Sequence, residues 1–559
     1  MFNSFRVAMT WVHTWLGLVL GFVLVVVFFF GSLSVFDREI DRWAIPETRF
    51  EPQPLPSFDT MLRPIFERIE PEAEELENAR ERVGQALPTN LRLMNWSAYT
   101  THRDPVLTLY AEYAVPNPQD PDDHVHGHVT IDPRNGQLLS HDQLALGSEF
   151  FYPMHISLHL HWLDLGYWIV GIAALAMLIA LVSGVVIHKK IFREFFTFRP
   201  HKQGQRTKLD LHNLTGVVAL PFHVMFPLTG LVIFAGIYFP VAETMLKPLA
   251  DKHEQIEARE KGLPHERSGI SAPLASVDAM VVEAKRRWAR RGMPGEVGYL
   301  AVNHVGDRSG YVTIYRAGSD RVTLVGQAIN FEAATGRVLY EEPPPTVISG
   351  IAEFLTGLHL QHFQHWLLRW LYVFGGLSGC VCIATGLVFF VGKRKQKHAA
   401  QGIQGARWVD ALAITSVTGP VLATLGILIA NRCLPADLAN RGTWQEGLFG
   451  ASWLIALAHA ALRSAPVRQA RIAPAWREQC CAITVLAGTA VVMNWITTGD
   501  HLARTIARGY WPVAGVDLAL LGTAGVALIA AHRLRRQEAG SRDEAPLNAA
   551  PFAEEATHG

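Results

Sequence analysis

Residues 8–36 read AMTWVHTWLGLVLGFVLVVVFFFGSLSVF and contain no Asp, Glu, Lys or Arg over 29 positions. An α-helix needs about 20 predominantly apolar residues to cross the hydrocarbon core of a bilayer. The stretch therefore predicts a membrane-spanning helix. Because it is too long for the apolar region of a signal peptide, we expect it to stay in the mature chain as an anchor.

Apolar runs of similar length recur along the chain, and 49% of its 559 residues are hydrophobic. A soluble protein of this length is usually less apolar and divides into several domains. We therefore predict a polytopic α-helical membrane protein with about eight spans. The expected spans are 8–36, 166–188, 211–238, 366–391, 408–431, 447–465, 477–497 and 512–532.

The formal net charge is zero, so the composition gives no sign of nucleic-acid binding. The basic residues instead gather in loops that the positive-inside rule assigns to the cytoplasm. With eight spans, both termini are then cytoplasmic and the two long intervening segments are periplasmic. The basic residues that set this orientation are Lys189, Lys190, Arg193, Arg199, Lys202, Arg206, Lys208, Lys393, Arg394, Lys395, Lys397, Arg463, Arg468, Arg471, Arg477, Arg533, Arg535 and Arg536.

Two of the spans share a sequence pattern. The first carries Val12-His13-Thr14-Trp15-Leu16-Gly17, and the third carries Leu211-His212-Asn213-Leu214-Thr215-Gly216. In both, a second glycine follows the histidine by eighteen residues, at Gly31 and at Gly230. Because self-similarity of this kind marks a repeated structural unit, it predicts a duplication within the chain.

The segments after these two spans repeat as well. Each holds a polar turn with a glycine and then an apolar strand, IDPRNGQLL at 131–139 and FEAATGRVL at 331–339. Each continues with a Leu-His pair and a span that ends in a small polar residue and glycine. These are Leu158-His159 and Leu358-His359, then Ser183-Gly184 and Thr385-Gly386.

The duplication predicts two span–lobe–span units with periplasmic α+β lobes, followed by four further spans without a recognisable task. The expected segments are span 1–36, lobe 37–160, span 161–190, basic loop 191–210, span 211–238, lobe 239–357, span 358–395, a four-span appendage 408–532 and a disordered cytoplasmic tail 533–559.

Histidines occur at membrane depth, where a polar side chain is costly and usually functional. We expect His13 and His212 near the cytoplasmic ends of their spans, with His188 on the same side. His159 and His359 fall at the outer ends, and His223 lies mid-membrane. On one straight helix, His212 and His223 differ by only ~20° in direction and by about 16 Å along the axis.

Neutral imidazole is a good iron ligand, so ligands at two depths predict two stacked b-type haems in a helix bundle. The repeat pairs His13 with His212 and His159 with His359, and it leaves His223 and His188 as further candidates. The alternative for each residue is an interfacial polar side chain, which is a plausible interpretation of His188 beside two lysines. The glycines near His13 and His212 admit either a porphyrin or ordinary helix packing.

Other histidines have weaker arguments. His155, His161, His362 and His365 crowd the expected outer mouth as alternative ligands or lining residues. His124, His126 and His128 alternate as on a strand, which is typical either of a metal-binding tract or of a solvated strand. Asp122, Asp123 and Glu149 are candidates for substrate binding, against the default of solvated charge.

Several motifs together resemble the PepSY-associated transmembrane-helix family over residues 1–395. They are Trp11–Gly17 (WVHTWLG), His188–Pro200 (HKKIFREFFTFRP), Leu211-His212-Asn213, Leu220–Met225 (LPFHVM), Leu358-His359 and Leu368–Tyr372 (LRWLY). The resemblance implies an iron-regulated protein of the bacterial inner membrane, similar to ferric-siderophore reductases. It further implies PepSY lobes at the outer mouth, b-type haem, and electrons passed to a periplasmic ferric siderophore or other ferric chelate with release of Fe(II).

Other redox motifs are missing from the sequence. The five cysteines, Cys380, Cys382, Cys433, Cys480 and Cys481, show no CxxC spacing, so we predict neither a disulfide framework nor a zinc site. No G-x-G-x-x-G follows a strand, and no expected cytoplasmic loop is long enough for a flavin or nicotinamide domain. The electron donor is then a membrane quinol or a separate reductase.

Two other functions remain open from the sequence. One is a non-enzymatic transporter or accessory protein for iron or siderophore uptake, in which the histidines are polar contacts or a metal path. The other is a PepSY binding module with a regulatory role, which leaves the membrane histidines unexplained.

Overall fold

The computed structural model describes residues 4–83, 87–88, 91–100, 104–116, 124–139, 143–188, 204–238, 261–264, 266–324, 327–401, 406–464 and 473–543. Asp122, Asp123, most of the basic loop 191–210 and the tail from residue 544 lie outside these ranges. The chain forms two compact units. Unit 1 comprises residues 1–44, 144–224 and 372–559, and unit 2 comprises 45–143 and 225–371.

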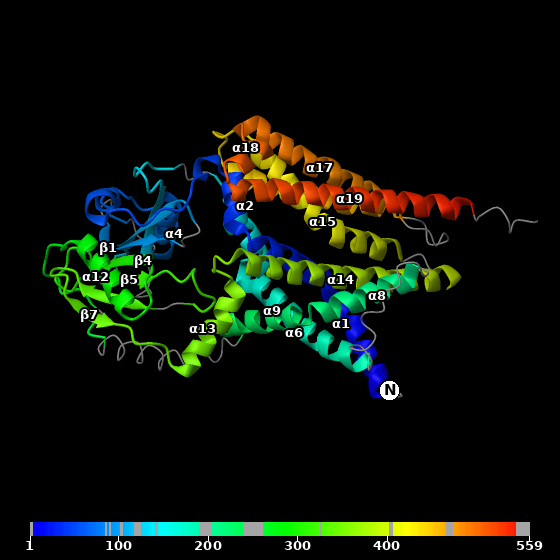
Figure 1. The fold of residues 1–559 in the computed structure, drawn as a ribbon, viewed down its shortest axis with the longest axis horizontal. Helices are drawn as coiled ribbons and strands as arrows, with labels where there is room; N and C mark the ends of the chain where they lie inside the picture. The colour runs from blue at the N-terminus through cyan, green and yellow to red at the C-terminus, as the bar shows by residue number, and fades with distance from the viewer. Residues whose placement is uncertain are drawn as a thin grey trace, which may run out of the picture. The chain divides into compact units, whose positions relative to one another are not determined.

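Six helices of the described chain are long and apolar enough to span a membrane (Figure 1). They lie in α1 (Phe5–Ser34), α6 (Leu165–Ile187), α14 (Trp366–Gln401), α15 (Ala406–Cys433), α17 (Pro474–Thr498) and α19 (Trp511–Asp543). The remaining helices of four or more residues in unit 1 are α2 (Asp37–Ala44), α5 (Tyr152–Ile156), α8 (Gly204–Val218), α16 (Arg441–Arg463) and α18 (Leu502–Ala507). The chain is therefore a polytopic helical membrane protein.

The expected third span is broken into two helices. Helix α8 ends at Val218, α9 (Leu220–Ile233) begins two residues later, and the two meet at 65°. Pro221 explains the break, because proline has no N–H to donate into the preceding turn and its ring clashes with that turn. The prediction that His212 and His223 face one direction assumed a straight helix, which the bend contradicts. Both rings nevertheless lie against α14, at the backbone oxygens of Cys382 and Gly375.

The count of spans is also lower than expected. The described residues give six spans, or seven if the bent pair counts as one, rather than eight. The difference is α16, which is 23 residues long and covers the expected span 447–465 but does not have the composition of a span. It carries Arg441, Gln445, Glu446 and His459 among its apolar residues, and it packs mainly against α15.

A buried polar cluster joins the appendage to the segment after α1. Asp517 of α19 is only 1% exposed. Its carboxylate accepts a hydrogen bond from Trp43 Nε1 of α2 at 2.8 Å and one from Asn494 Nδ2 of α17 at 3.3 Å. Because a buried carboxylate without partners is strongly destabilising, these donors stabilise the contact between α2 and the appendage.

Unit 2 is built on one antiparallel sheet rather than on two separate lobes. The strands follow the order β3-β2-β1-β4-β5-β6-β7 (Figure 1). Their bounds are β1 (Arg92–Tyr99), β2 (Leu107–Ala114), β3 (His124–Ile131), β4 (Val297–Asn303), β5 (Tyr311–Arg316), β6 (Ala328–Glu332) and β7 (Val338–Glu341). Strands β1 and β4 come from the two repeats and pair from Trp96↔Val302 to Tyr99↔Tyr299. This pairing removes the free edge that each lobe alone would expose.

Short helices cover one face of this sheet. They include η2 (Phe58–Leu62), α3 (Arg63–Phe66) and α12 (Val277–Arg290), and they bury Phe66, Met280 and Trp288 against the strands. Strand residues such as Trp96, Leu300 and Phe331 complete this core. The other elements of unit 2 are η1 (Pro46–Thr48), α4 (Ala73–Val83), α10 (Ala235–Tyr238) and α13 (Val347–Leu360).

The predicted turn of each repeat is confirmed. Gly136 and Gly336 have φ of +72° and +73°, a conformation that side chains disfavour. The N–H of each glycine donates to the residue four positions earlier, Asp132 or Glu332, at 2.8 Å in both cases. The two repeats therefore share this turn at the level of single hydrogen bonds.

The two repeats also cap each other's helices. Asp278 accepts hydrogen bonds from Ser57 Oγ at 2.5 Å and from Phe58 N at 2.7 Å. In return, Asp59 accepts from Ser276 Oγ at 2.6 Å and from Val277 N at 3.1 Å. Each carboxylate thus satisfies otherwise orphaned donors at the start of the other repeat's helix.

Replacing Asp59 or Asp278 by Ala should lower the free energy of local opening of the sheet by about 1–3 kcal/mol. This is the cost of leaving buried donors unpaired. Hydrogen exchange of the β1 and β4 amides in the purified full chain measures this as faster local opening. Glu67→Ala is a suitable control, because its exposed ion pair with Arg63 contributes little. Exchange rates no faster than in the control would contradict the mutual capping.

Candidate functional site

His13 of α1 lies against the end of α6. Its Nδ1 is 2.9 Å from the backbone oxygen of Ala180. A carbonyl can only accept, so Nδ1 carries the proton and the lone pair is on Nε2. Gly184 makes the approach possible, because a Cβ built there would lie 3.3 Å from His13 Cε1.

His212 of α8 repeats this geometry against α14. Its Nδ1 donates to the backbone oxygen of Cys382 at 2.7 Å, and a Cβ on Gly386 would lie 3.2 Å from its Cε1. The carbonyl precedes the glycine by four residues in both halves. The duplication inferred from sequence therefore extends to the hydrogen bond that fixes the tautomer. Cys382 Sγ also lies 3.5 Å from His212 Nδ1.

The two rings face each other within unit 1. The centroids of His13 and His212 are 6.1 Å apart, and the ring planes are inclined at 81°. A metal–imidazole bond is about 2 Å long, so two imidazoles that share one metal ion have ring centroids roughly 6 Å apart. The observed separation and the tautomer of both rings fit axial ligation of a porphyrin iron by Nε2.

His155 occupies the other end of the first repeat. It lies on α5, which follows η3 (Leu146–Phe151), and its Nδ1 donates to the backbone oxygen of Val27 at 2.8 Å. A Cβ on Gly31 would lie only 2.8 Å from this ring. His155 is thus held in the same tautomer as His13, with a glycine of α1 beneath it.

His359 of α13 has the matching environment in unit 2. Its Nδ1 lies 2.8 Å from Thr229 Oγ1, and a Cβ on Gly230 would lie 3.1 Å from its Cε1. The Thr229 hydroxyl proton is used at 2.6 Å by the backbone oxygen of Met225, so Oγ1 accepts from His359. This ring therefore also has its proton on Nδ1.

The geometry favours His155 over His159 as the first-repeat counterpart of His359. His159 has a left-handed backbone with φ of +54° and stacks on Phe150 at 4.7 Å. Its Nε2 donates to the Phe150 carbonyl at 2.8 Å, so its lone pair is on Nδ1, unlike the lone pairs of His13, His212, His155 and His359, which are on Nε2. His159 and His359 belong to different units, and the proposed pairing of those two residues stays a prediction.

The sequence contains a spacing that selects His155, but it is counted back from a tryptophan that follows rather than forward from the turn glycine. His155 and His359 both stand seven residues before a tryptophan, Trp162 and Trp366. His159 and His359 instead both stand 23 residues after the turn glycines. The two spacings select different residues, and only the structure shows which histidine meets a glycine.

Acidic side chains hold the segment that carries His155. Asp41 of α2 accepts the backbone N–H of Gly147 at 2.6 Å and that of Ser148 at 3.3 Å. Burial raises the pKa of Asp41 to about 7. Glu149 accepts the backbone N–H of Ala145 at 2.8 Å, which ties it to the start of η3. Glu149 thus has a structural role, and its predicted role in substrate binding stays untested.

The other two predicted ligands have different surroundings. His223 is fully buried in α9, with Nε2 3.3 Å from the backbone oxygen of Gly375 and its ring edge-on to Phe28. Among the described residues, its Nδ1 has no hydrogen-bond partner. The backbone N–H of His188 donates to the oxygen of Gly184, which places His188 at the same end of α6 as His13.

The three alternating histidines of β3 each lie beside a carboxylate, and the side chain of His126 is also half-exposed. His124 lies 3.4 Å from Glu112, His126 lies 3.1 Å from Glu75, and His128 contacts Glu72. Within the described ranges, no group of three or more His, Cys, Asp or Glu side chains is arranged to hold a metal ion. The geometry therefore favours ion pairing on this strand over a metal-binding tract.

Comparison with known proteins gives two matches. The family model of the PepSY-associated TM region matches residues 10–393. The "Uncharacterized protein PA4219" of Pseudomonas aeruginosa PAO1 is 26% identical over 374 residues, which cover 64% of this chain and 87% of that protein. All six predicted ligands and His155 lie inside the matched region, whereas α15 to α19 lie beyond it.

Proposed function

The chain belongs to the PepSY-associated transmembrane family, and from this premise we propose that it is a haem-b electron carrier of the bacterial inner membrane. In this proposal it reduces a ferric siderophore or other ferric chelate at the periplasmic face and so acts as a ferric-chelate reductase. In this proposal both termini are cytoplasmic and the sheet unit is periplasmic, as the positive-inside rule favours, which requires α16 to cross the membrane together with the bent pair.

One observation carries the proposal. His13 and His212 approach to 6.1 Å between ring centroids, and each donates its Nδ1–H to a carbonyl of the next span. An interfacial polar histidine needs neither a fixed tautomer nor a partner ring at this distance. Two imidazoles that would hold one iron need both, because each Nε2 would have to present its lone pair.

The residues of the chain then have distinct tasks. The carbonyls of Ala180 and Cys382 orient the two rings, and the glycines beside them let the helices approach. Bound haem supplies a one-electron carrier. His155 and His359 are proposed as ligands in their own repeats on the same tautomer argument, with His159, His223 and His188 as alternatives.

The substrate side follows from the chemistry of iron. Fe(III) gains one electron and becomes Fe(II), which hard oxygen donors bind less tightly, so the chelate releases it. The electron comes from a membrane quinol or a separate reductase in this proposal, since the sequence shows no fingerprint of a flavin or nicotinamide domain.

The direct test is an optical spectrum of the purified full chain. We expect a b-type spectrum that changes on reduction by dithionite, about two haems per chain, and reoxidation by a ferric chelate. A colourless preparation from haem-replete cells would remove the proposal's main support. Transport of iron or its chelate into vesicles without any haem signal would favour the transporter instead.

A further inference from the structure

The face of the sheet opposite the core is hollowed into a groove. The groove has a volume of about 470 Å³, within the usual range for sites that take small molecules. Its lining comes from β1, β2 and β3 of the first repeat and β4 of the second. The groove therefore exists only because β1 and β4 pair, and neither lobe alone would form it.

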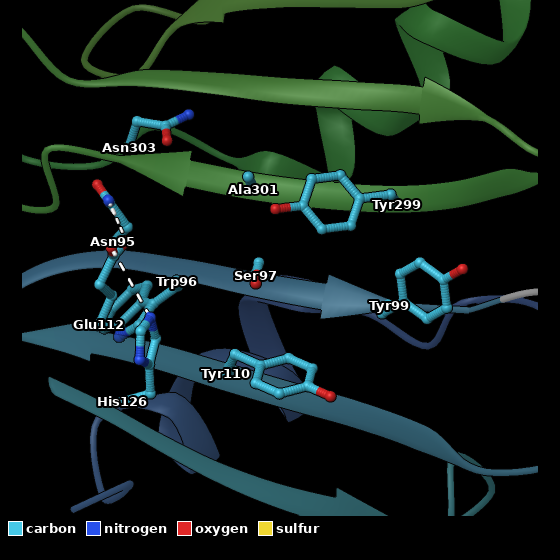
Figure 2. A pocket seen from close by; sticks show the side chains of 10 residues that line it. All are labelled: Asn95, Trp96, Ser97, Tyr99, Tyr110, Glu112, His126, Tyr299, Ala301 and Asn303. Atoms are coloured by element: carbon cyan, nitrogen blue, oxygen red, sulfur yellow. Dashed lines mark hydrogen bonds and ion pairs between the residues drawn. The ribbon is translucent and has the colours of Figure 1, made fainter. Parts of the chain in front are cut away.

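Small side chains make the hollow and tyrosines border it. Ser97 and Ala301 are cross-strand partners on β1 and β4, and they form a low floor. Figure 2 shows the rings of Tyr299 and Tyr110 on either side of this floor, with Tyr99 further along β1. Aromatic faces on both sides of a shallow floor suit a flat aromatic ring, because offset stacking adds to the burial of area.

The polar end of the groove is arranged in advance. Asn95 Nδ2 donates to Glu112 at 2.5 Å, and Asn95 Oδ1 accepts the backbone N–H of His304 at 3.1 Å. Asn303 and His126 complete this end of the lining (Figure 2). Because these amide and carboxylate groups are held by the sheet, a ligand meets them without ordering them first.

We propose that this groove binds the aryl ring of a ferric chelate whose iron donors are phenolate oxygens. This inference rests on the proposed function and narrows its substrate class. A phenolate chelate presents a planar ring that stacks between Tyr110 and Tyr299. The aliphatic linkers of a hydroxamate chelate have no aromatic face and gain nothing from the tyrosines.

Gallium(III) complexes test the groove without electron transfer, since gallium(III) has the charge and nearly the size of iron(III) but is not reduced here. Titration calorimetry on the detergent-purified full chain compares a phenolate chelate with a linear trihydroxamate chelate. We expect Ser97→Phe, which fills the floor, and Tyr110→Ala each to weaken phenolate binding about tenfold. Tyr340→Ala, a tyrosine of β7 outside the lining, should leave it within about twofold.

Three outcomes would overturn the inference. They are equal affinity for both chelates, an affinity for the phenolate chelate that is unchanged in both Ser97→Phe and Tyr110→Ala, and displacement of the chelate by an extended peptide. A circular-dichroism melt of the same samples shows that each variant is folded, and their optical spectrum separates the two proposals. A colourless chain with groove-dependent phenolate binding defeats only the electron carrier. A haem-loaded chain without such binding defeats only the groove.

Discussion

His13→Ala and His212→Ala should each remove the same haem from the purified chain, lowering the haem content to about half of wild type if two are bound. In the proposal, both rings would hold one haem iron, and each would supply one of its two imidazole nitrogens. With either ring gone, the remaining imidazole cannot hold the porphyrin at its former affinity. Haem per chain and the reduced-minus-oxidised spectrum measure the loss.

His459→Ala is the matched control for these two variants. His459 also lies on a helix of unit 1, but its Nε2 is 3.1 Å from a carboxylate oxygen of Glu478. The residue itself lies outside the region that the family model matches. Full haem content in both His13→Ala and His212→Ala would contradict the pairing.

In the same assay, His155→Ala should lose haem while His159→Ala retains it, because only His155 presents an unprotonated Nε2.

The sequence predicted the duplication and the proximity of His13 and His212, and their role as haem ligands stays a prediction. His13 and His212 sit in regular helices, so a spacing of four and eighteen residues to glycine translates directly into position along the axis. The structure adds the partner glycines, which lie in the following spans. Sequence spacing within one helix cannot show which residues of another helix meet it.

The outer histidine was harder to identify because the two repeats reach it differently. In the second repeat, a continuous helix α13 carries His359 and ends at Gln361 in a left-handed conformation. In the first, the short helix α5 ends at Ile156, and the next segment holds left-handed residues at Leu158 and His159. The chain thus reaches a histidine that faces a glycine four residues earlier, and a count from the turn glycine selects His159 rather than His155. Which of the two binds haem stays a prediction.

Two features of the fold could not follow from local patterns. The joining of the two lobes depends on β1 and β4 pairing over a separation of about two hundred residues, and alternating strands carry no information on which edges meet. Pro221 explains the bend at Ala219, but the apolar run alone cannot distinguish a bent span from a straight one. Two of the polar side chains that lower the apolarity of α16 have protein partners: Arg441 donates to the backbone oxygen of Asn431 on α15, and His459 lies beside Glu478 of α17.

Gly184→Val and Gly386→Val should lower haem content toward about half of wild type while leaving both histidines in the chain. A Cβ at either position would already lie within 3.3 Å of the ring it faces, and the two methyl groups of valine reach further. Overpacking of this kind shifts side chains from their minima at a cost of about 1–3 kcal/mol. The ring must then move away from its carbonyl, which releases the tautomer that presents Nε2.

A merely structural role for these glycines predicts a different pattern. Close helix packing alone would lower the melting temperature of the variants without changing haem per folded chain. Gly522→Val on α19 is the control, because a Cβ there meets nothing within 4 Å. Gly386→Ala should fall between wild type and valine, since the contact at 3.2 Å asks the ring to shift by only a few tenths of an ångström. Haem loss that follows side-chain size at 184 and 386 but not at 522 ties the glycines to ligand geometry, and equal haem content across the series would refute that link.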